Sequence, residues 1–395
     1  MRTVFLQRII ITLFLILNLS TDILLAQNLA SSNKEHFPEF SWDHVPLYVH
    51  IRKNTEFTAE EIEYLATFPL ITFEKSTGNK DFGSTEKGTL KAARAVKELN
   101  PNTKILYYRN VIVHYGGYDA SSQLADIPDA FLIGNNGNKK LIRNRLEAYD
   151  LSNKALRNWW ISAAQSVCSD PAIDGVFLDG VVKVLEPSFL KSEIGEKKKA
   201  ELLDGYVTMV KDTRQALGSD KLMIANILRA RFPDCGLSYI REIDGSYIEG
   251  FEGAVGGMSK KDYVAKGISA FQKAAQEGAI IAFTCGLGKN HQDADETFGD
   301  QIINEEQKKY DAKSRFNYQL AIFLICAEKY SYFDLKDSYD AKTSTSWMTH
   351  PEAYKRPLGP PKGPAVRNGY TYTREFAHAS VWLDIENEKA RIEWK

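Results

Sequence analysis

The stretch Asp174-Gly175-Val176-Phe177-Leu178-Asp179-Gly180 decides how this chain is interpreted. Its short apolar centre lies between two carboxylates and is followed by a glycine, which is typical of a strand buried on both faces. Burying the terminal carboxylate without partners would cost several kcal/mol. We therefore expect Asp179 to open onto a cleft at the carboxyl end of its strand.

Seven further apolar runs alternate with amphipathic segments along the chain. They cover residues 46–51, 70–73, 105–113, 222–227, 245–249, 279–285 and 330–335. Helices are expected at 84–99, 199–217, 259–277 and 316–328, and another after the N-cap Thr58, with Glu61 as its capping-box partner. Eight strands separated by helices predict a closed (β/α)8 TIM barrel, an α/β fold. A doubly wound open sheet is the alternative, but no glycine-rich phosphate loop follows the first strand.

Four segments are expected in the chain. A signal peptide covers 1–27, a polar lead 28–45, the barrel 46–335, and a Pro/Gly-rich loop with a β hairpin or small β appendage 336–395. The signal is predicted because Arg2 and Arg8 precede an apolar run too short for a membrane span. We therefore expect a protein exported to the periplasm or the cell exterior, with no membrane anchor.

The composition is that of an ordinary soluble globular protein. Of the 395 residues, 44% are hydrophobic and 26% charged, and the formal net charge is -1. No basic stripe appears, so nucleic acid is not expected as a partner. The four cysteines are scattered without Cys-x-x-Cys spacing, which argues against a zinc site, and we predict no disulfide essential to the fold. The sequence does not indicate an oligomeric state.

Two strand-end acids are the candidate catalytic residues. Asp179 shares a strand face with Phe177, whereas Asp174 begins the same strand and is expected to be scaffold. Glu249 ends the run 245–249 and is followed by a glycine that permits close approach of a ligand. Two carboxylates on one barrel rim match glycoside hydrolysis, in which one protonates the leaving oxygen and the other attacks or activates water.

Further polar residues at strand ends are candidates for binding sugar hydroxyls, although each could equally be structural. They are Glu74, Tyr108, Asn110 and Asn226, with Glu252 as a loop residue in reserve. Arg109 alternates to the opposite strand face from Tyr108 and Asn110. Two long connections, 114–152 and 336–370, follow the third and eighth strands and are expected at the same rim.

Three motifs in order along the chain resemble one family of glycoside hydrolases. They are Asp174-Gly-Val-Phe-Leu-Asp179, Tyr149-Asp-Leu-Ser with Trp159-Trp160, and the ending Tyr372-Thr-Arg-Glu-Phe with Val381-Trp-Leu-Asp. Together they resemble the glycosyl-hydrolase-like family 15, and more distantly the endo-polygalactosaminidase type of TIM barrel. The resemblance implies that Asp179 is the nucleophile and Glu249 the acid/base, which is a retaining mechanism on a carbohydrate substrate.

Two other functions stay open at this stage. A barrel that binds glycan without cleaving it would keep cleft aromatics but no matched acid pair, and a polysaccharide lyase would use Arg109, His114 and Tyr115. The sequence around His291, Asp293 and Asp295 lacks the glycine and final Glu of a calcium loop. No Gly-x-Ser-x-Gly or Walker motif occurs, so we expect neither a metal nor a cofactor.

Overall fold

A computed structural model describes residues 34–249, 251–252, 257–286, 305–344 and 346–395. Residues 1–35 and 36–395 form two separate units, and the second is the one described below. The expected signal peptide and the residues His291, Asp293 and Asp295 lie outside the described residues. No helix in the described part of the chain is long and apolar enough to cross a membrane.

Eight parallel strands form one sheet in the order of the chain, as a TIM barrel requires. The strands are β1 (Val49–Ile51), β2 (Leu70–Phe73), β3 (Lys104–Asn110), β4 (Gly175–Asp179), β5 (Leu222–Asn226), β6 (Gly245–Ile248), β7 (Ile280–Gly286) and β8 (Ser331–Lys336). The last strand meets the first, because the backbone N–H of Tyr48 donates to the Phe333 carbonyl at 3.0 Å and Phe333 N–H donates to Pro46. The predicted barrel is confirmed.

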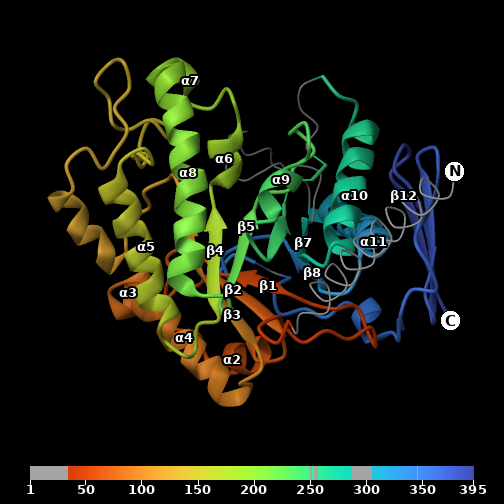
Figure 1. Cartoon of the computed structure of the whole chain (residues 1–395). Helices are drawn as coiled ribbons and strands as arrows, with labels where there is room; N and C mark the ends of the chain where they lie inside the picture. Colours follow the sequence, from red (N-terminus) through yellow and green to blue (C-terminus); the bar gives the residue numbers. More distant parts are fainter. Residues whose placement is uncertain (1–33, 250, 253–256, 287–304, 345) are drawn as a thin grey trace, which may run out of the picture. The chain divides into compact units, whose positions relative to one another are not determined.

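Helices follow the strands and surround the barrel (Figure 1). They are α2 (Ala59–Leu65), α3 (Asn79–Phe82), α4 (Thr85–Leu99), α5 (Lys154–Cys168), α6 (Val181–Leu185), α7 (Lys191–Ile194), α8 (Glu196–Leu217), α9 (Leu237–Ile240), α10 (Lys260–Gln276) and α11 (Glu305–Cys326). Short 3-10 helices are η1 (Asp119–Asp126) and η2 (Glu352–Lys355). The predicted capping box of Thr58 and Glu61 opens α2. The last helix begins at Glu305 rather than at residue 316. The sequence pattern did not indicate its first turns because they are rich in charged residues and show no apolar stripe.

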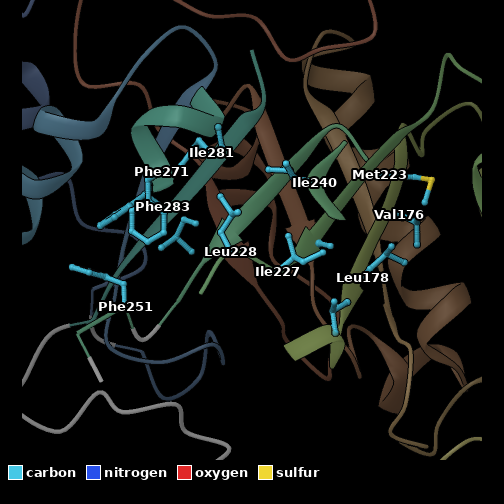
Figure 2. Close-up of a cluster of buried hydrophobic side chains, with 14 of the residues drawn as sticks. Val176, Leu178, Met223, Ile227, Leu228, Ile240, Phe251, Phe271, Ile281 and Phe283 are labelled. Atoms are coloured by element: carbon cyan, nitrogen blue, oxygen red, sulfur yellow. The ribbon is translucent and has the colours of Figure 1, made fainter. Parts of the chain in front are cut away.

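Alternating residues of the strands divide the core into two layers. The smaller, inner cluster includes Leu106, Tyr108, Phe177 and Tyr247. The larger, outer cluster contains the alternate residues of the same strands, such as Tyr107 and Val176, together with residues of the helices. Figure 2 shows part of the larger cluster, with Val176 and Leu178 from β4 and Phe271 from α10. This alternation fixes which strand-end residues point toward the barrel axis.

Residues 36–45, the last part of the expected polar lead, belong to the same unit as the barrel. Phe37 belongs to the inner cluster, and the Tyr332 hydroxyl on β8 donates to the carbonyls of Pro38 and Glu39 at 3.0 and 3.1 Å. These contacts come from the start of β8, so the lead covers the amino-terminal end of the barrel. The opposite, carboxyl end of the strands is left for a site.

The C-terminal region is a four-stranded antiparallel sheet rather than a lone hairpin. Its strands are β9 (Val366–Asn368), β10 (Thr371–Glu375), β11 (Ala379–Asp384) and β12 (Lys389–Trp394), and it packs against α11. The buried guanidinium of Arg374 donates to the carbonyls of Leu324 and Ile325 and pairs with Glu328 at 2.7 Å. The sheet therefore holds the end of α11 and is the small β appendage predicted.

Candidate active site

The turn after β4 places Asp179 at the carboxyl end of the barrel. Four buried residues precede it, and its own side chain is only partly buried. Gly180 follows with φ of 76°, and a Cβ at this position would lie 2.5 Å from the Asn110 side-chain oxygen. Glycine is therefore required both by the left-handed backbone and by the close approach of β3.

Three neutral donors hold the Asp179 carboxylate. The Tyr108 hydroxyl donates to Oδ2 at 2.5 Å, the Asn110 amide donates to the same oxygen at 3.1 Å, and the Asn226 amide donates to Oδ1 at 3.3 Å. No Lys, Arg or His of the described residues forms an ion pair with it. The carboxylate is thus oriented without its charge being neutralised, which suits a nucleophile.

The backbone after β3 decides which way the Asn110 amide faces. Its Oδ1 accepts from the N–H groups of Ile112 and Val113, at 3.0 and 2.7 Å. Because the oxygen is occupied by these donors, the NH₂ group is the one turned toward Asp179. The sequence Asn110-Val-Ile-Val113 therefore builds an oriented donor directly at the strand exit.

Asn226, at the end of β5, joins the two candidate carboxylates. Its Nδ2 lies 3.3 Å from Asp179 Oδ1 and 3.1 Å from Glu249 Oε2. Those two oxygens are therefore at most 6.4 Å apart, the sum of the two distances. The Asn226 oxygen accepts from Arg229 Nη2 at 2.5 Å, and this guanidinium also lies 3.7 Å from Glu249. Asp179 and Glu249, from β4 and the end of β6, thus share one site.

Glu74 forms a buried charged group beside the carboxylate pair. Lys75 donates to both Glu74 oxygens at 3.0 Å, and His50 Nε2 lies 3.6 Å away. Burial alone would raise the pKa of Glu74, but the Lys75 charge and the His50 contact outweigh it and hold the pKa at about 2. Burial lowers the pKa of His50 to about 4, although Glu74 opposes the shift. Glu74 is therefore an anion beside a neutral imidazole at pH 7.

A second buried network completes the site and was not predicted from the sequence. Lys336 Nζ donates to the Tyr247 hydroxyl at 2.7 Å, which contacts the Tyr339 hydroxyl at 2.9 Å, and Asp334 lies 3.8 Å from Lys336. Burial raises the pKa of Asp334 and lowers that of Lys336, while each opposes the other's shift. Period-two alternation along β8 placed Asp334 and Lys336 on one face and was the signal available.

Two cavities meet at Asp179, Asn226 and Glu249. The first, of about 380 Å³, is lined by His50, Glu74, Lys75, Tyr115, Tyr247 and Tyr339 as well. The second, of about 220 Å³, lies over α6 and the segment after β5, with Phe189, Lys183, Arg229 and Arg231 in its walls. The carboxylate pair therefore stands between two spaces, an arrangement that would allow sugar rings to bind on both sides of a bond at the pair.

The remaining candidate residues lie elsewhere. Glu252 lines neither cavity and pairs with Arg315 and Gln319 of α11. Arg109 is 2% exposed, and its guanidinium packs over Tyr118 and both tryptophans of α5. Its burial removes it from the chemistry that a lyase would need.

The other two lyase candidates, His114 and Tyr115, do not line the same cavity. Tyr115 lines the first cavity, whereas His114 Nδ1 contacts the Tyr149 hydroxyl at 2.9 Å and His114 lines neither cavity.

Within the described residues no group of His, Cys, Asp and Glu could hold a metal ion. Cys168, Cys235 and Cys326 are free thiols, and the Cys285 side chain lies outside the described part.

Comparison with known proteins places the chain in a family. Residues 97–380 match the model described as hypothetical glycosyl hydrolase family 15. The chain belongs to this family. The resemblance predicted from the β4 and C-terminal motifs is thus confirmed, and the family is described as one of glycosyl hydrolases. No curated protein sequence matches the chain.

Two solved structures are similar to this chain, and the first of them supports its fold. The chain is 12% identical to a maltogenic α-amylase from Thermotoga neapolitana, covering 90% of this chain and 87% of that one with a TM-score of 0.50. It is 11% identical to a GH36 α-galactosidase from Geobacillus stearothermophilus, covering 87% of this chain and 48% of that one with a TM-score of 0.47. The chain therefore spans about half the length of this α-galactosidase. At such low sequence identities the similarity shows the fold alone.

Proposed function

We propose that this family member is a retaining glycoside hydrolase in which Asp179 is the nucleophile and Glu249 the acid/base. The observation that carries the proposal is the Asn226 amide, which hydrogen-bonds both carboxylates and limits their facing oxygens to at most 6.4 Å. Retaining enzymes hold the two groups about 5–5.5 Å apart, whereas inverting enzymes need about 6.5–9.5 Å to admit a water. The upper bound of 6.4 Å lies below the range of inverting enzymes and therefore supports retention.

The reaction proceeds in two steps at this pair. In the first, Glu249 gives its proton to the glycosidic oxygen while the Asp179 carboxylate attacks the anomeric carbon and forms a glycosyl ester. In the second, Glu249 takes a proton from water, which attacks the same carbon and releases Asp179. The donors from Tyr108, Asn110 and Asn226 orient the attacking carboxylate throughout.

Neutral and charged hydrogen-bonding groups in the first cavity would bind the sugar. Glu74, ionised with a pKa of about 2, accepts hydrogen bonds from hydroxyl groups, and Lys75 donates them. Tyr115 and Tyr339 offer aromatic surface for the apolar face of a ring. A binding protein without activity would have no need for two acids joined by one amide, so hydrolysis accounts for the geometry better.

The proposal is tested on the purified chain with a panel of polysaccharides, following the release of reducing ends. Asp179→Asn and Glu249→Gln should each abolish hydrolysis while circular dichroism and thermal unfolding match the parent. Proton NMR of the first products should show the anomeric configuration of the substrate. Full activity in either variant, or an inverted first product, would refute the assignment.

We also propose that the protein acts outside the cytoplasm. The support is the sequence of the first 27 residues, with two arginines before an apolar run. Fractionation of cells producing the full chain should find it in the periplasm or medium, shortened near residue 27. A protein found only in the cytoplasm at full length would contradict this.

A further inference from the structure

The wall of the first cavity contains a buried nitrogen atom without a hydrogen-bond partner. His50, the central residue of β1, lines this cavity and is 2% exposed. Its Nε2 atom has no hydrogen-bond partner among the described residues, and Glu74 Oε1 lies 3.6 Å away, beyond hydrogen-bonding distance. Because an unpaired buried polar atom costs stability, its position beside the acid pair indicates a role in binding.

A chain of hydrogen bonds assigns the proton of the imidazole to its other nitrogen. The Tyr48 hydroxyl donates its one proton to Thr72 Oγ1 at 2.7 Å, so it accepts from His50 Nδ1, which lies 3.0 Å away. Burial lowers the pKa of His50 to about 4, so the imidazole is neutral at pH 7 and carries a single N–H. The Nε2 atom is therefore a hydrogen-bond acceptor.

Two acceptors thus lie side by side in the cavity wall. Glu74 lines the same cavity, and its Oε1 has lone-pair capacity left although Lys75 already donates to it at 3.0 Å. His50 Nε2 and Glu74 Oε1 cannot bind each other, because neither atom carries a proton. A ligand that satisfies both must supply a proton to each of them.

Aromatic rings and one hydroxyl group hold the imidazole in place. Its centroid lies 4.8 Å from that of Phe177, 5.0 Å from that of Tyr247 and 5.4 Å from that of Tyr339. Turning the ring over would break the hydrogen bond between His50 Nδ1 and Tyr48. The acceptor is therefore preorganised, which favours binding because little side-chain freedom is lost.

We propose that His50 Nε2 and Glu74 bind two neighbouring hydroxyl groups of the sugar ring in the first cavity, one at each acceptor. A single hydroxyl has one proton and would satisfy only one of them, whereas hydroxyls on adjacent ring carbons can donate to both. The inference rests on the proposed function, since it names the part of the substrate that is recognised beside the same acid pair. The bound ring must then carry free adjacent hydroxyl groups rather than methylated or acetylated ones.

Binding is measured by nitrogen NMR of the full chain labelled at its histidine rings. The probes are glucose, galactose, mannose and N-acetylgalactosamine, each compared with its fully O-methylated form, which keeps the ring but has no hydroxyl proton. At least one free sugar should shift the His50 Nε2 resonance to saturation, and its methylated form should not. No shift with any free sugar would mean that Nε2 binds water only, and an equal shift with the methylated form would overturn the proposal as well.

Variants test the same contact during turnover of the polysaccharide that the parent chain cleaves. His50→Phe keeps a ring but removes the acceptor, so kcat/KM should fall about 10–100-fold. His50→Gln, whose amide oxygen can accept a hydrogen bond, should recover part of this loss. His114→Phe is the matched control, because the same side chain is lost outside both cavities. Equal kinetics in His50→Phe and His114→Phe would overturn the proposal, and the NMR measurement decides it if His50→Phe does not fold.

The hydroxyl site and the glycosidase assignment can fail separately. Loss of hydrolysis in Asp179→Asn and Glu249→Gln, with parental kinetics in His50→Phe, would overturn the hydroxyl site and leave the glycosidase assignment standing. A saturable shift of His50 Nε2 in a chain that cleaves no polysaccharide would support the hydroxyl site and refute the glycosidase assignment.

Discussion

The two ends of β4 carry the same residue type in opposite electrostatic settings. At the start of the strand, Asp174 lies 2.9 Å from Lys97 and 3.7 Å from Lys104, and accepts from the Ile105 N–H at 2.8 Å. At the other end, Asp179 accepts only from neutral hydroxyl and amide groups of the described residues. One carboxylate is neutralised by cations, and the other is oriented with its charge kept.

This difference separates a structural acid from the acid that we propose to be reactive. An ion pair stabilises the fold but lowers the nucleophilicity of the carboxylate, whereas neutral donors fix its direction at a smaller loss of reactivity. The neighbourhood of Asp179 also buries groups that cost stability, such as His50 and the pair Asp334 and Lys336. This fits the general rule that TIM barrels keep their active sites at the carboxyl end and their stabilising contacts at the amino end.

Exchanging the two acids for amides gives the largest expected contrast. Asp179→Asn should lower kcat on the order of 10⁴-fold, because the attacking group is lost, with little change in thermal unfolding. Asp174→Asn should leave kcat within about twofold and reduce the free energy of unfolding by about 1–2 kcal/mol, as its partly exposed ion pairs are lost. Steady-state kinetics and urea unfolding measure both. Equal loss of activity in the two variants would remove the contrast.

Replacing the shared donor tests the link between the carboxylates. Asn226→Asp removes the NH₂ group and adds a third negative charge between Asp179 and Glu249, so kcat/KM should fall about 10²–10³-fold. The profile of rate against pH should move to higher pH, because three neighbouring carboxylates hold protons more strongly than two. Asn226→Ala, which removes the donor without adding charge, should show a smaller loss and a smaller displacement. An Asn226→Asp variant with parental kinetics would show that the Asn226 amide is not needed as the shared donor to the two carboxylates.

Much of this arrangement follows from the sequence. The eight apolar runs fix the barrel, and period-two alternation from Phe177 to Asp179 and from Tyr247 to Glu249 turns both acids toward the axis. The same rule brings in Tyr108 and Asn110 from β3, and Asn226 from β5. Residues at strand exits were therefore predictable as neighbours, although their pairing distances were not.

Other residues could not be placed by alternation alone. His50 and Lys336 meet through Tyr247 only because β8 closes against β1, a long-range contact that no local pattern encodes. Glu252 follows β6 in a loop, where no period defines the direction of a side chain, and it turns to Arg315 instead of the cavity.

The buried imidazole of His50 predicts how stability responds to acid. Burial lowers its folded-state pKa to about 4 from 6.5, so the unfolded chain binds the proton more readily between these values. The stability associated with neutral His50 is complete above about pH 6.5 and is lost as the pH falls toward 4, on the order of 3 kcal/mol. His50→Gln should flatten the free energy of unfolding over this range, measured by urea titration at several pH values. A slope unchanged by the substitution would contradict the prediction.

The smallest expected effect comes from a single hydroxyl group on β3. Tyr108→Phe removes the 2.5 Å donor to Asp179 but keeps the ring stacked on Phe177 and the Asn110 donor in place. The loss of one charged hydrogen bond should lower kcat about tenfold at unchanged KM. Tyr107→Phe is the matched control, since that ring lies in the outer cluster and its loss should leave kcat unaltered. Equal kcat values in the two variants would show that the hydrogen bond from Tyr108 does not contribute to the activity of Asp179. The neutral donors would then not account for the difference between the two ends of β4.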